Sequence, residues 1–436
     1  MQTMPNEIAA ESSRRASALS PAADQPDESS RQATRFLTRQ PLLDKDYRIL
    51  GYELKVNDRT PLPVLPGATT WRQIQDELLL VCVIDEHYRQ AFSRKLTLLN
   101  LHAESLDNPL LENLPRENVI LSIRPTTPDP ALLARCQALS REDFALALDT
   151  AAFTPGLTPL ARQCRYLSFD VADNDLMGLC DRMAGIQGLR EQRLIARNVR
   201  FEETFTACGK LGFDVYQGYF FTEVRPASGR GIDTHRLLIM KLLNLVMKHA
   251  EFPELEAQFK LDAGLSLKLL RFINSPGVGL RYPIRSLNHV LMMLGHDQLY
   301  RWLTLLLFNH ESSDGRNQAL LRNALVRARF AEILGETRLP ADMRGGLFIT
   351  GILSMLDALL NMPMAQAIGA LKLSAPTVDA LLNGEGVYAP FLRLAIACEK
   401  GNQRSIEQLS AAMGISAEEV NIAHINALVW SEGLDF

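Results

Sequence analysis

The sequence predicts two folded parts, a (β/α) barrel followed by an all-α domain, and three observations carry this prediction. Short apolar segments of strand type alternate with amphipathic helical stretches over residues 36–225. A break rich in Pro, Gly and Ser occupies residues 226–234 and reads as a linker. The apolar pattern over residues 235–430 then has helical spacing throughout. The 436 residues suffice for two or three domains, each with its own core.

Seven strand-like runs build the first part of the chain. Amphipathic helical stretches, for example residues 71–91 and 201–211, lie between several of them. Alternating strands and helices imply a parallel sheet with crossover helices. Seven or eight such units within residues 36–225 fit a closed barrel of the TIM type better than an open sheet. The runs are residues 47–53, 96–101, 119–123, 144–149, 166–170, 193–196 and 215–219.

The second part and the N-terminal segment differ sharply in composition. Helix-ending residues such as Gly295, Gly335 and Gly414 punctuate the apolar pattern of the second part, which predicts an all-helical domain. Residues 1–35 mix Ser, Ala, Pro, Asp and Arg with almost no large apolar residue. Such a segment cannot bury enough surface to offset its ordering entropy, so we expect a disordered tail there.

Composition excludes several classes of function. A formal charge of -4 and a pI near 6.1 give no basic field for nucleic-acid binding. The apolar runs fall short of the roughly 20 residues that span a bilayer, so we expect no membrane segment. The six cysteines form no close pair, which argues against a zinc site or a disulfide scaffold. Because no secretory signal opens the chain, we expect a cytoplasmic protein.

Polar residues stand at or beside the ends of the predicted strands, in a fixed order along the chain. The relevant segments are Arg39–Asp44 with Gly51–Lys55, Leu99–Leu101, Ala147–Thr150, Leu167–Asp170, Ile195–Arg200 and Gln217–Phe220. Together they resemble the EAL domain, the bacterial cyclic-di-GMP phosphodiesterase barrel. No single segment is specific, but their shared order across residues 36–225 is. The resemblance implies a TIM-type barrel with its site at the carboxyl ends of the strands.

Three segments of the helical part carry a second resemblance. They are Asp262–Ser275, Ile284–Gly295 and Gly351–Asp357. These resemble the HDOD domain, an all-helical relative of the HD phosphohydrolases. An EAL-like domain followed by an HDOD domain is the arrangement of a group of bacterial signalling proteins. The resemblance therefore implies a role in signal transduction near cyclic-di-GMP.

The positions that carry chemistry in active EAL domains are only partly retained. Glu53, Asn100, Asp149 and Gln217 stand at matching positions. Others are replaced, and the replacing residues are Ser122, Thr150, Ser168, Arg197 and Arg200. We interpret the set as a vestigial, degenerate EAL cavity.

Charge arithmetic underlies that interpretation. Two-metal hydrolysis needs several carboxylates to hold two divalent cations, which together carry four positive charges. Glu53 and Asp149 offer two negative charges, and Arg197 and Arg200 would cancel them. Unit charges about 4 Å apart interact by roughly 1 kcal/mol in water and about 4 kcal/mol at an effective dielectric near 20. The sequence thus predicts no metal, no catalytic residue, no cofactor and no enzymatic activity.

Two interpretations of the arginines stay open. Arg197 and Arg200 could bind the phosphates of cyclic-di-GMP, since guanidinium suits bidentate contact with phosphate. Alternatively they pair with Glu53 and Asp149 and neutralise the cavity, and the sequence favours this pairing. Cyclic-di-GMP is then a possible ligand that the sequence does not favour.

The helical domain shows a similar loss at its own motif. HD phosphohydrolases ligate metal with a His-Asp pair and further His and Asp residues. The position resembling that pair is Ser354-Met355. A literal His296-Asp297 follows Gly295 at a helix break, where we expect Asp297 to cap the next helix.

These observations favour a non-catalytic bacterial scaffold or regulator that acts through protein–protein interactions. The HDOD domain is the expected binding surface, for partners that the sequence does not identify. Two alternatives remain: an effector that binds cyclic-di-GMP without hydrolysis, and a residual cyclic-di-GMP phosphodiesterase. The pathway rests on resemblance alone.

Overall fold

The structure is a computed structural model that describes most of the chain after residue 35. It covers residues 36–57, 71–125, 127–172, 175–186, 188–189, 191–225, 232–275, 284, 286–308 and 315–434. These residues belong to one compact unit. The tail predicted over residues 1–35 and residues 226–231 of the predicted linker lie outside the described residues.

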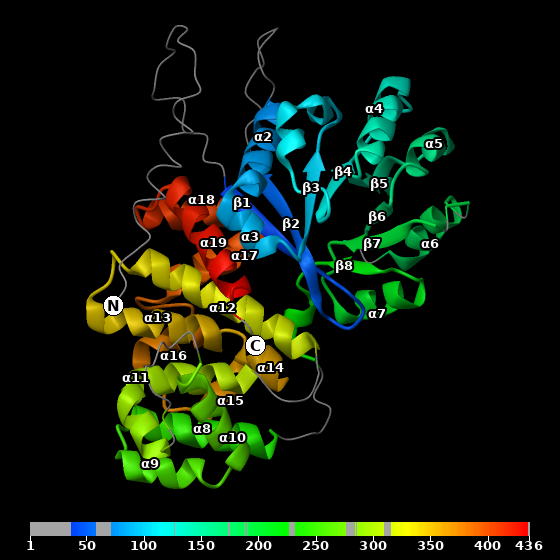
Figure 1. Ribbon diagram of the computed structural model, residues 1–436. Helices are drawn as coiled ribbons and strands as arrows, with labels where there is room; N and C mark the ends of the chain where they lie inside the picture. Colours follow the sequence, from blue (N-terminus) through cyan, green and yellow to red (C-terminus); the bar gives the residue numbers. More distant parts are fainter. Residues whose placement is uncertain are drawn as a thin grey trace, which may run out of the picture. The chain divides into compact units, whose positions relative to one another are not determined.

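Eight strands close into a barrel in the order of the sequence (Figure 1). The first strand, β1, runs antiparallel to both of its neighbours, β2 and β8, and all the other pairs are parallel. The prediction of a TIM-type barrel is confirmed. The strands are β1 Phe36–Leu43, β2 Ile49–Asn57, β3 Leu96–Leu101, β4 Val119–Ile123, β5 Ala145–Asp149, β6 Tyr166–Asp170, β7 Arg193–Arg197 and β8 Val215–Gln217.

Helices connect the parallel strands, as the alternation predicts. The stretch expected over residues 71–91 is two helices that break at Asp85, and the one expected over residues 201–211 is α7. The α-helices are α2 Trp71–Ile84, α3 Glu86–Phe92, α4 Pro130–Arg141, α5 Thr158–Ala161, α6 Leu176–Ala184 and α7 Glu202–Lys210. The 3₁₀ turns are η2 Ala103–Asp107, η3 Pro109–Asn113, η4 Thr150–Ala152, η5 Pro155–Leu157 and η6 Phe220–Thr222.

An apolar layer fills the interior of the barrel toward the amino ends of the parallel strands. It consists of Leu42, Leu98, Ile120, Ala147, Tyr166, Ile195 and Val215, and all of these side chains are buried. Successive side chains on a strand point to opposite faces, so the residue two positions along points into the barrel again. On the parallel strands β2 to β8, the inward-pointing residue of the next layer lies two positions closer to the carboxyl end of the strand. On β1, which runs the opposite way, it lies two positions closer to the amino end of the strand. The next layer of the interior is therefore built from one residue of each strand.

The remainder of the described chain is helical, which confirms the predicted all-α domain. Caps fix several helix starts, for example Asp262 before α10 and the Ser416–Glu419 capping box of α19. The helices are α8 Thr234–Met247, α9 Phe252–Phe259, α10 Ala263–Ile273, α11 Leu287–Phe308, α12 Gly315–Gly335, α13 Ala341–Leu353, α14 Leu356–Leu360, α15 Met364–Gly369, α16 Ala375–Leu382, α17 Ala389–Lys400, α18 Gln403–Ala412 and α19 Ala417–Glu432.

Glycines permit two close approaches between backbones. A Cβ atom at Gly351 would lie 2.3 Å from the Cα atom of Ala328, so the contact between α12 and α13 requires glycine. At Gly315, the first residue of α12, a Cβ atom would lie 1.9 Å from the carbonyl oxygen of Asp46 in the β1–β2 turn. The second contact joins the helical part directly to the barrel.

Helices α17 and α19 pack against β1 (Figure 1). The Leu37 amide of β1 donates a hydrogen bond to Asn421 Oδ1 at 2.8 Å. The hydroxyl of Tyr52, on β2, donates to Glu432 Oε1 at the end of α19, also at 2.8 Å. The outer face of the barrel at β1 and β2 is thus a contact surface for the helical domain.

One stretch, Ala341–Leu360, is long and apolar enough to cross a membrane by length and composition. It comprises α13 and α14 and is mostly buried inside the protein. A mostly buried core segment passes the same test, so the stretch is weak support for a membrane segment. The cytoplasmic location stays a prediction.

Candidate functional site

One residue from each of the eight strands forms a polar layer directly above the apolar layer of the barrel. All but Gln40 and Asn100, which are half-buried, are buried. The members of this polar layer are Gln40, Glu53, Asn100, Ser122, Asp149, Ser168, Arg197 and Gln217. The strand register therefore brings together every retained EAL-like position and three of the five replaced ones.

Arg197 lies at the centre of this layer and bridges its two carboxylates. Its Nη1 donates to Asp149 Oδ2 at 2.6 Å and its Nη2 to Glu53 Oε1 at 3.1 Å, while only 6% of Arg197 is exposed. Burial lowers the pKa of Arg197, but the carboxylates of Glu53, Asp149 and Asp170 outweigh burial and leave this pKa raised. Arg197 is a permanent cation held between two anions.

Glu53 is fully buried and accepts hydrogen bonds from several sides. Besides Arg197, the side-chain amides of Asn100 and Gln217 donate to it, and Lys55 Nζ lies 2.9 Å from its Oε2. The Gln217 amide also donates to Gln40 Oε1, which ties β8 to β1. The carboxylate of Glu53 is therefore saturated with donors from four neighbouring positions.

Asp149 has a second arginine partner that the sequence did not reveal. Arg124, immediately after β4, donates from Nε at 2.8 Å and from Nη2 at 2.5 Å to Asp149 Oδ2. The side chain of Arg124 is 57% exposed, so it approaches Asp149 from the mouth of the barrel. The sequence position of Arg124 could have predicted this contact, because a residue two positions after Ser122 lies on the same face of the strand.

Of the three hydroxyls at replaced positions, those of Thr150 and Ser168 turn to the backbone and not to the side chains of the polar layer. The Thr150 hydroxyl donates to the carbonyl of Ser168 at 2.8 Å, and the Ser168 hydroxyl donates to the carbonyl of Leu148 at 3.4 Å. The Ser122 hydroxyl is buried and has no hydrogen-bond partner among the described residues. Two of the three hydroxyls thus bond the backbone of neighbouring strands.

Arg200 does not join the polar layer. Asn198 adopts a left-handed conformation with φ 59° and turns the chain after β7; its amide donates to Gln217 Oε1 and its Nδ2 to Asp170 Oδ2. Arg200 follows this turn and is exposed. Within the described part of the chain, no ion pair joins Arg200 to Glu53 or Asp149. Arg197 pairs with both carboxylates as expected, and Arg124 pairs with Asp149 where Arg200 was the candidate.

The charges of the site do not fit two divalent cations in this arrangement. Glu53, Asp149 and Asp170 contribute three negative charges around Arg197, and Arg197, Arg124 and Lys55 contribute three positive charges. A divalent ion here would face a shell with no net negative charge. The carboxylate oxygens that would ligate it already hold the guanidinium groups, and among the described residues no group of three or more His, Cys, Asp or Glu is arranged to hold a metal ion.

In the helical domain, too, a buried arginine pairs with a carboxylate, next to Ser354. Arg327, on α12, donates from Nε to both carboxylate oxygens of Glu399 at 3.0 and 2.8 Å. Its Nη1 donates to Ser354 Oγ at 3.0 Å, at the position that resembles the His-Asp pair. His296 lies elsewhere: its Nε2 is 2.9 Å from the Ala250 carbonyl. The buried Arg327–Glu399 pair, which sequence reasoning missed, is the main ionic feature beside Ser354.

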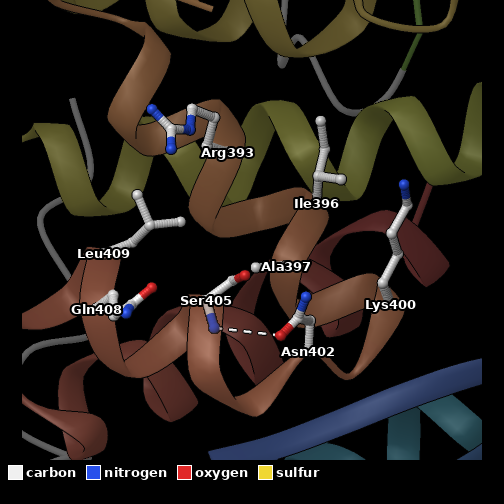
Figure 2. Close-up of a pocket in the computed structure, with 8 residues that line it drawn as sticks. All are labelled: Arg393, Ile396, Ala397, Lys400, Asn402, Ser405, Gln408 and Leu409. Atoms are coloured by element: carbon white, nitrogen blue, oxygen red, sulfur yellow. Dashed lines mark hydrogen bonds between the residues drawn. The ribbon is translucent and has the colours of Figure 1, made fainter.

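A hollow of about 320 Å³ lies between α17 and α18 (Figure 2). The N-cap of α18 borders it, where the Ser405 amide donates to Asn402 Oδ1 at 3.2 Å. The exposed cations Arg393 and Lys400 of α17 stand on its rim. Its lining residues are Arg393, Ile396, Ala397, Lys400, Asn402, Ser405, Gln408 and Leu409.

Comparisons with known proteins bear on both parts of the chain. Residues 236–368 match the HDOD domain family. Cyclic di-GMP phosphodiesterase CdgJ of Vibrio cholerae is 28% identical over 425 residues, 96% of either chain. The uncharacterized protein YuxH of Bacillus subtilis is 26% identical over 414 residues, 92% of this chain and 98% of YuxH.

Solved EAL domains resemble about half of the chain. An EAL domain protein from Listeria monocytogenes aligns with 46% of this chain and 94% of its own, at 15% identity and a TM-score of 0.36. The chain thus combines an EAL-like eight-stranded barrel with an HDOD domain.

One prediction needs correction. The expectation that the chain is not an enzyme is contradicted, because a relative that spans both domains carries the name of a cyclic-di-GMP phosphodiesterase. The charge count behind that expectation describes the arrangement in which Arg197 lies between Glu53 and Asp149. It does not describe an arrangement in which the Arg197 side chain has left the two carboxylates.

Proposed function

We propose that this chain is a regulator in cyclic-di-GMP signalling that binds protein partners through its helical domain. The observation that carries the proposal is the continuity between the two parts. The polar layer of the barrel includes Gln40 of β1, and the opposite face of β1 is covered by α17 and α19. A change in the polar layer therefore acts on β1, the strand that contacts α17 and α19 of the helical domain.

The hollow between α17 and α18 supports the assignment of a binding surface to the helical domain. Arg393 and Lys400 give it a positive rim, and none of its lining residues is acidic. Binding sites combine apolar lining with a few placed polar groups, and Ile396 and Leu409 supply the apolar part. The matching partner is an acidic segment of another protein.

The test uses the full chain, because α17 and α19 contact the barrel. Proteins captured by the wild type are compared with those captured by a variant with Arg393→Glu and Lys400→Glu. A variant with Lys241→Glu, an exposed position on α8, controls for added negative charge. Partners lost with the double substitution and kept with the control support the surface. Equal capture by all three proteins removes it.

The barrel contributes a second part of the proposal, binding of cyclic-di-GMP at its mouth. Arg124, whose side chain is 57% exposed, and the exposed Arg200 are the cations available to phosphate oxygens there. Calorimetric titration with cyclic-di-GMP, in Mg²⁺ or Mn²⁺ and then in chelator, tests it. Binding that persists in chelator and falls at least tenfold with Arg124→Gln supports a guanidinium site. Undetectable binding at tens of micromolar nucleotide refutes it.

Hydrolysis of cyclic-di-GMP is a second candidate function. It is favoured by the name of the Vibrio relative and by the retained residues Glu53, Asn100, Asp149 and Gln217. The carboxylates present fit a metal pair only if Arg197 leaves them. Product formation is measured with Mg²⁺ or Mn²⁺ in the wild type and in Glu53→Gln. Turnover that disappears with Glu53→Gln supports the candidate, and product that is absent or unchanged by that substitution dismisses it.

A further inference from the structure

The strand β1 has two faces that meet different parts of the molecule. Gln40 points into the barrel, where its Oε1 accepts a hydrogen bond from Gln217, the amide that also donates to Glu53. The neighbouring residue, Arg39, points outward into the helical domain, because adjacent side chains on a strand face opposite ways. Movement of β1 at this point therefore displaces both side chains together.

Arg39 is buried with an incomplete set of partners. It is 3% exposed, and its guanidinium lies over the Tyr52 ring at 5.1 Å from the centroid. Its Nε donates to His424 Nε2 on α19 at 3.1 Å, and its Nη2 has no hydrogen-bond partner among the described residues. Burial lowers the pKa of His424 to about 3, so the imidazole is neutral and acts as the acceptor.

Two carboxylates lie close enough to influence Arg39 but are held by other groups. Burial lowers the pKa of Arg39, while the hydroxyls of Tyr219 and Tyr52 and the carboxylates of Glu399 and Glu432 leave it raised. Glu399 is bound by Arg327, which in turn reaches Ser354 of the helical domain. The Arg39 guanidinium thus lies under-bonded in the electrostatic field of two carboxylates, and buried polar groups with unmade bonds are costly.

We propose that β1 transmits the state of the barrel's polar layer to α17 and α19 through Arg39. A change at Gln217 and Gln40 shifts β1, and Arg39 then moves from His424 toward the carboxylates of Glu399 and Glu432. This alters the ion pair between Glu399 and Arg327 and so reaches the region beside Ser354. The inference rests on the proposed function only for the identity of the signal, cyclic-di-GMP; the connection itself is a property of the folded chain.

The connection can be measured without any ligand through Cys398. This thiol is 2% exposed on α17, next to Glu399, and burial raises its pKa to about 12. Labelling of Cys398 requires local opening of α17, so its rate reports the opening equilibrium. The buried Cys208 on α7, away from this contact, serves as the control, and peptide mass spectrometry separates the two thiols.

A double-mutant cycle pairs Gln40→Met with Glu399→Gln in the full chain. If the two sites are independent, the fold-changes in Cys398 labelling multiply in the double variant. We expect the double variant to differ from that product by at least about threefold, and the deviation to vanish when the cycle is repeated with Arg39→Met. Cys208 labelling stays within twofold in every variant.

Multiplicative fold-changes in the wild-type background would overturn the connection. So would a deviation that persists with Arg39→Met, because the coupling would then bypass Arg39. Where Gln40→Met does not fold, Gln40→Asn, which shortens the side chain by one methylene group, takes its place. Cyclic-di-GMP is added last. Coupling in the cycle without any response to the nucleotide would contradict the proposed signal and leave the connection standing.

Discussion

Removal of the Arg197 guanidinium is the most direct test of how the barrel balances its charge. Arg197→Met keeps much of the aliphatic volume and removes both ion pairs of a residue that is 6% exposed. Breaking a buried pair by removing one partner typically costs about 3–5 kcal/mol, because a buried charge is left uncompensated. Lys55 still pairs with Glu53, and Arg124 still pairs with Asp149, so we expect about 3 kcal/mol.

The assay is urea-induced unfolding at pH 7, with the free energy of unfolding taken from the linear dependence on denaturant. Adding Glu53→Gln and Asp149→Asn to Arg197→Met should recover at least half of the loss, since no buried charge is then left unpaired. Arg200→Met is the matched control, because Arg200 is exposed and outside the polar layer; we expect a change within about 0.5 kcal/mol. A loss below about 1 kcal/mol with Arg197→Met would refute the reasoning.

Two further predictions concern the contact between the barrel and the helical domain. The pKa of His424 falls from 6.5 to about 3 on folding, so the unfolded chain binds the extra proton and stability declines as the pH falls from 6.5 toward 3. Between pH 7 and 5 this contributes about 2 kcal/mol, which His424→Gln should remove; equal pH dependence of unfolding in both proteins contradicts it. Gly315→Ala places a Cβ atom against the Asp46 carbonyl and should cost about 1–3 kcal/mol, whereas Gly369→Ala meets open space and should change stability by less than about 0.5 kcal/mol. If the two glycine variants changed the melting temperature equally, the turn at Asp46 would move aside without cost and the prediction would be wrong.

The sequence predicted the parallel strands well because each is a short apolar run whose two faces are both buried. The strand that it did not predict is β1, and the reason lies in what β1 contacts. Gln40 faces polar partners inside the barrel, and Arg39 faces a histidine on α19, so no apolar alternation marks the segment. β1 pairs along its whole length with the nearby β2, but β8, α17 and α19, which cover the rest of it, come from far away in the sequence. The buried polar residues of Phe36–Leu43 therefore find their partners only in the tertiary structure.

The candidate site was predictable as far as strand register reaches. The polar layer could be predicted from strand register. Asn100, Asp149 and Gln217 each lie two residues beyond a member of the apolar layer on the same strand, and Glu53 lies directly opposite a member of that layer on the neighbouring strand. The ion pairs were not predictable to the same extent. Arg200 is only three residues from Arg197, but the left-handed Asn198 turns the chain between them. Arg124 enters instead because β4 ends just before it and leaves its side chain at the mouth of the barrel.

The two buried arginine pairs lead to one last prediction, about divalent metal ions. Arg197 bridges Glu53 and Asp149 in the barrel, and Arg327 holds Glu399 beside Ser354 in the helical domain. In both places a covalently attached cation balances the buried carboxylate charge. The carboxylates therefore need no external cation to remain buried.

Chelation should accordingly leave the melting temperature of the wild type unchanged within about 1 °C. Arg197→Ala, which frees the two carboxylates, should gain stability from Mn²⁺, by about 2.7 kcal/mol when the ion is at one hundred times its dissociation constant. Asp149→Asn in the Arg197→Ala background removes one of the two carboxylates and should abolish the gain. If the wild type gained as much from Mn²⁺ as Arg197→Ala does, the arginine would not be standing in for the metal, and the charge balance derived from the polar layer would be wrong.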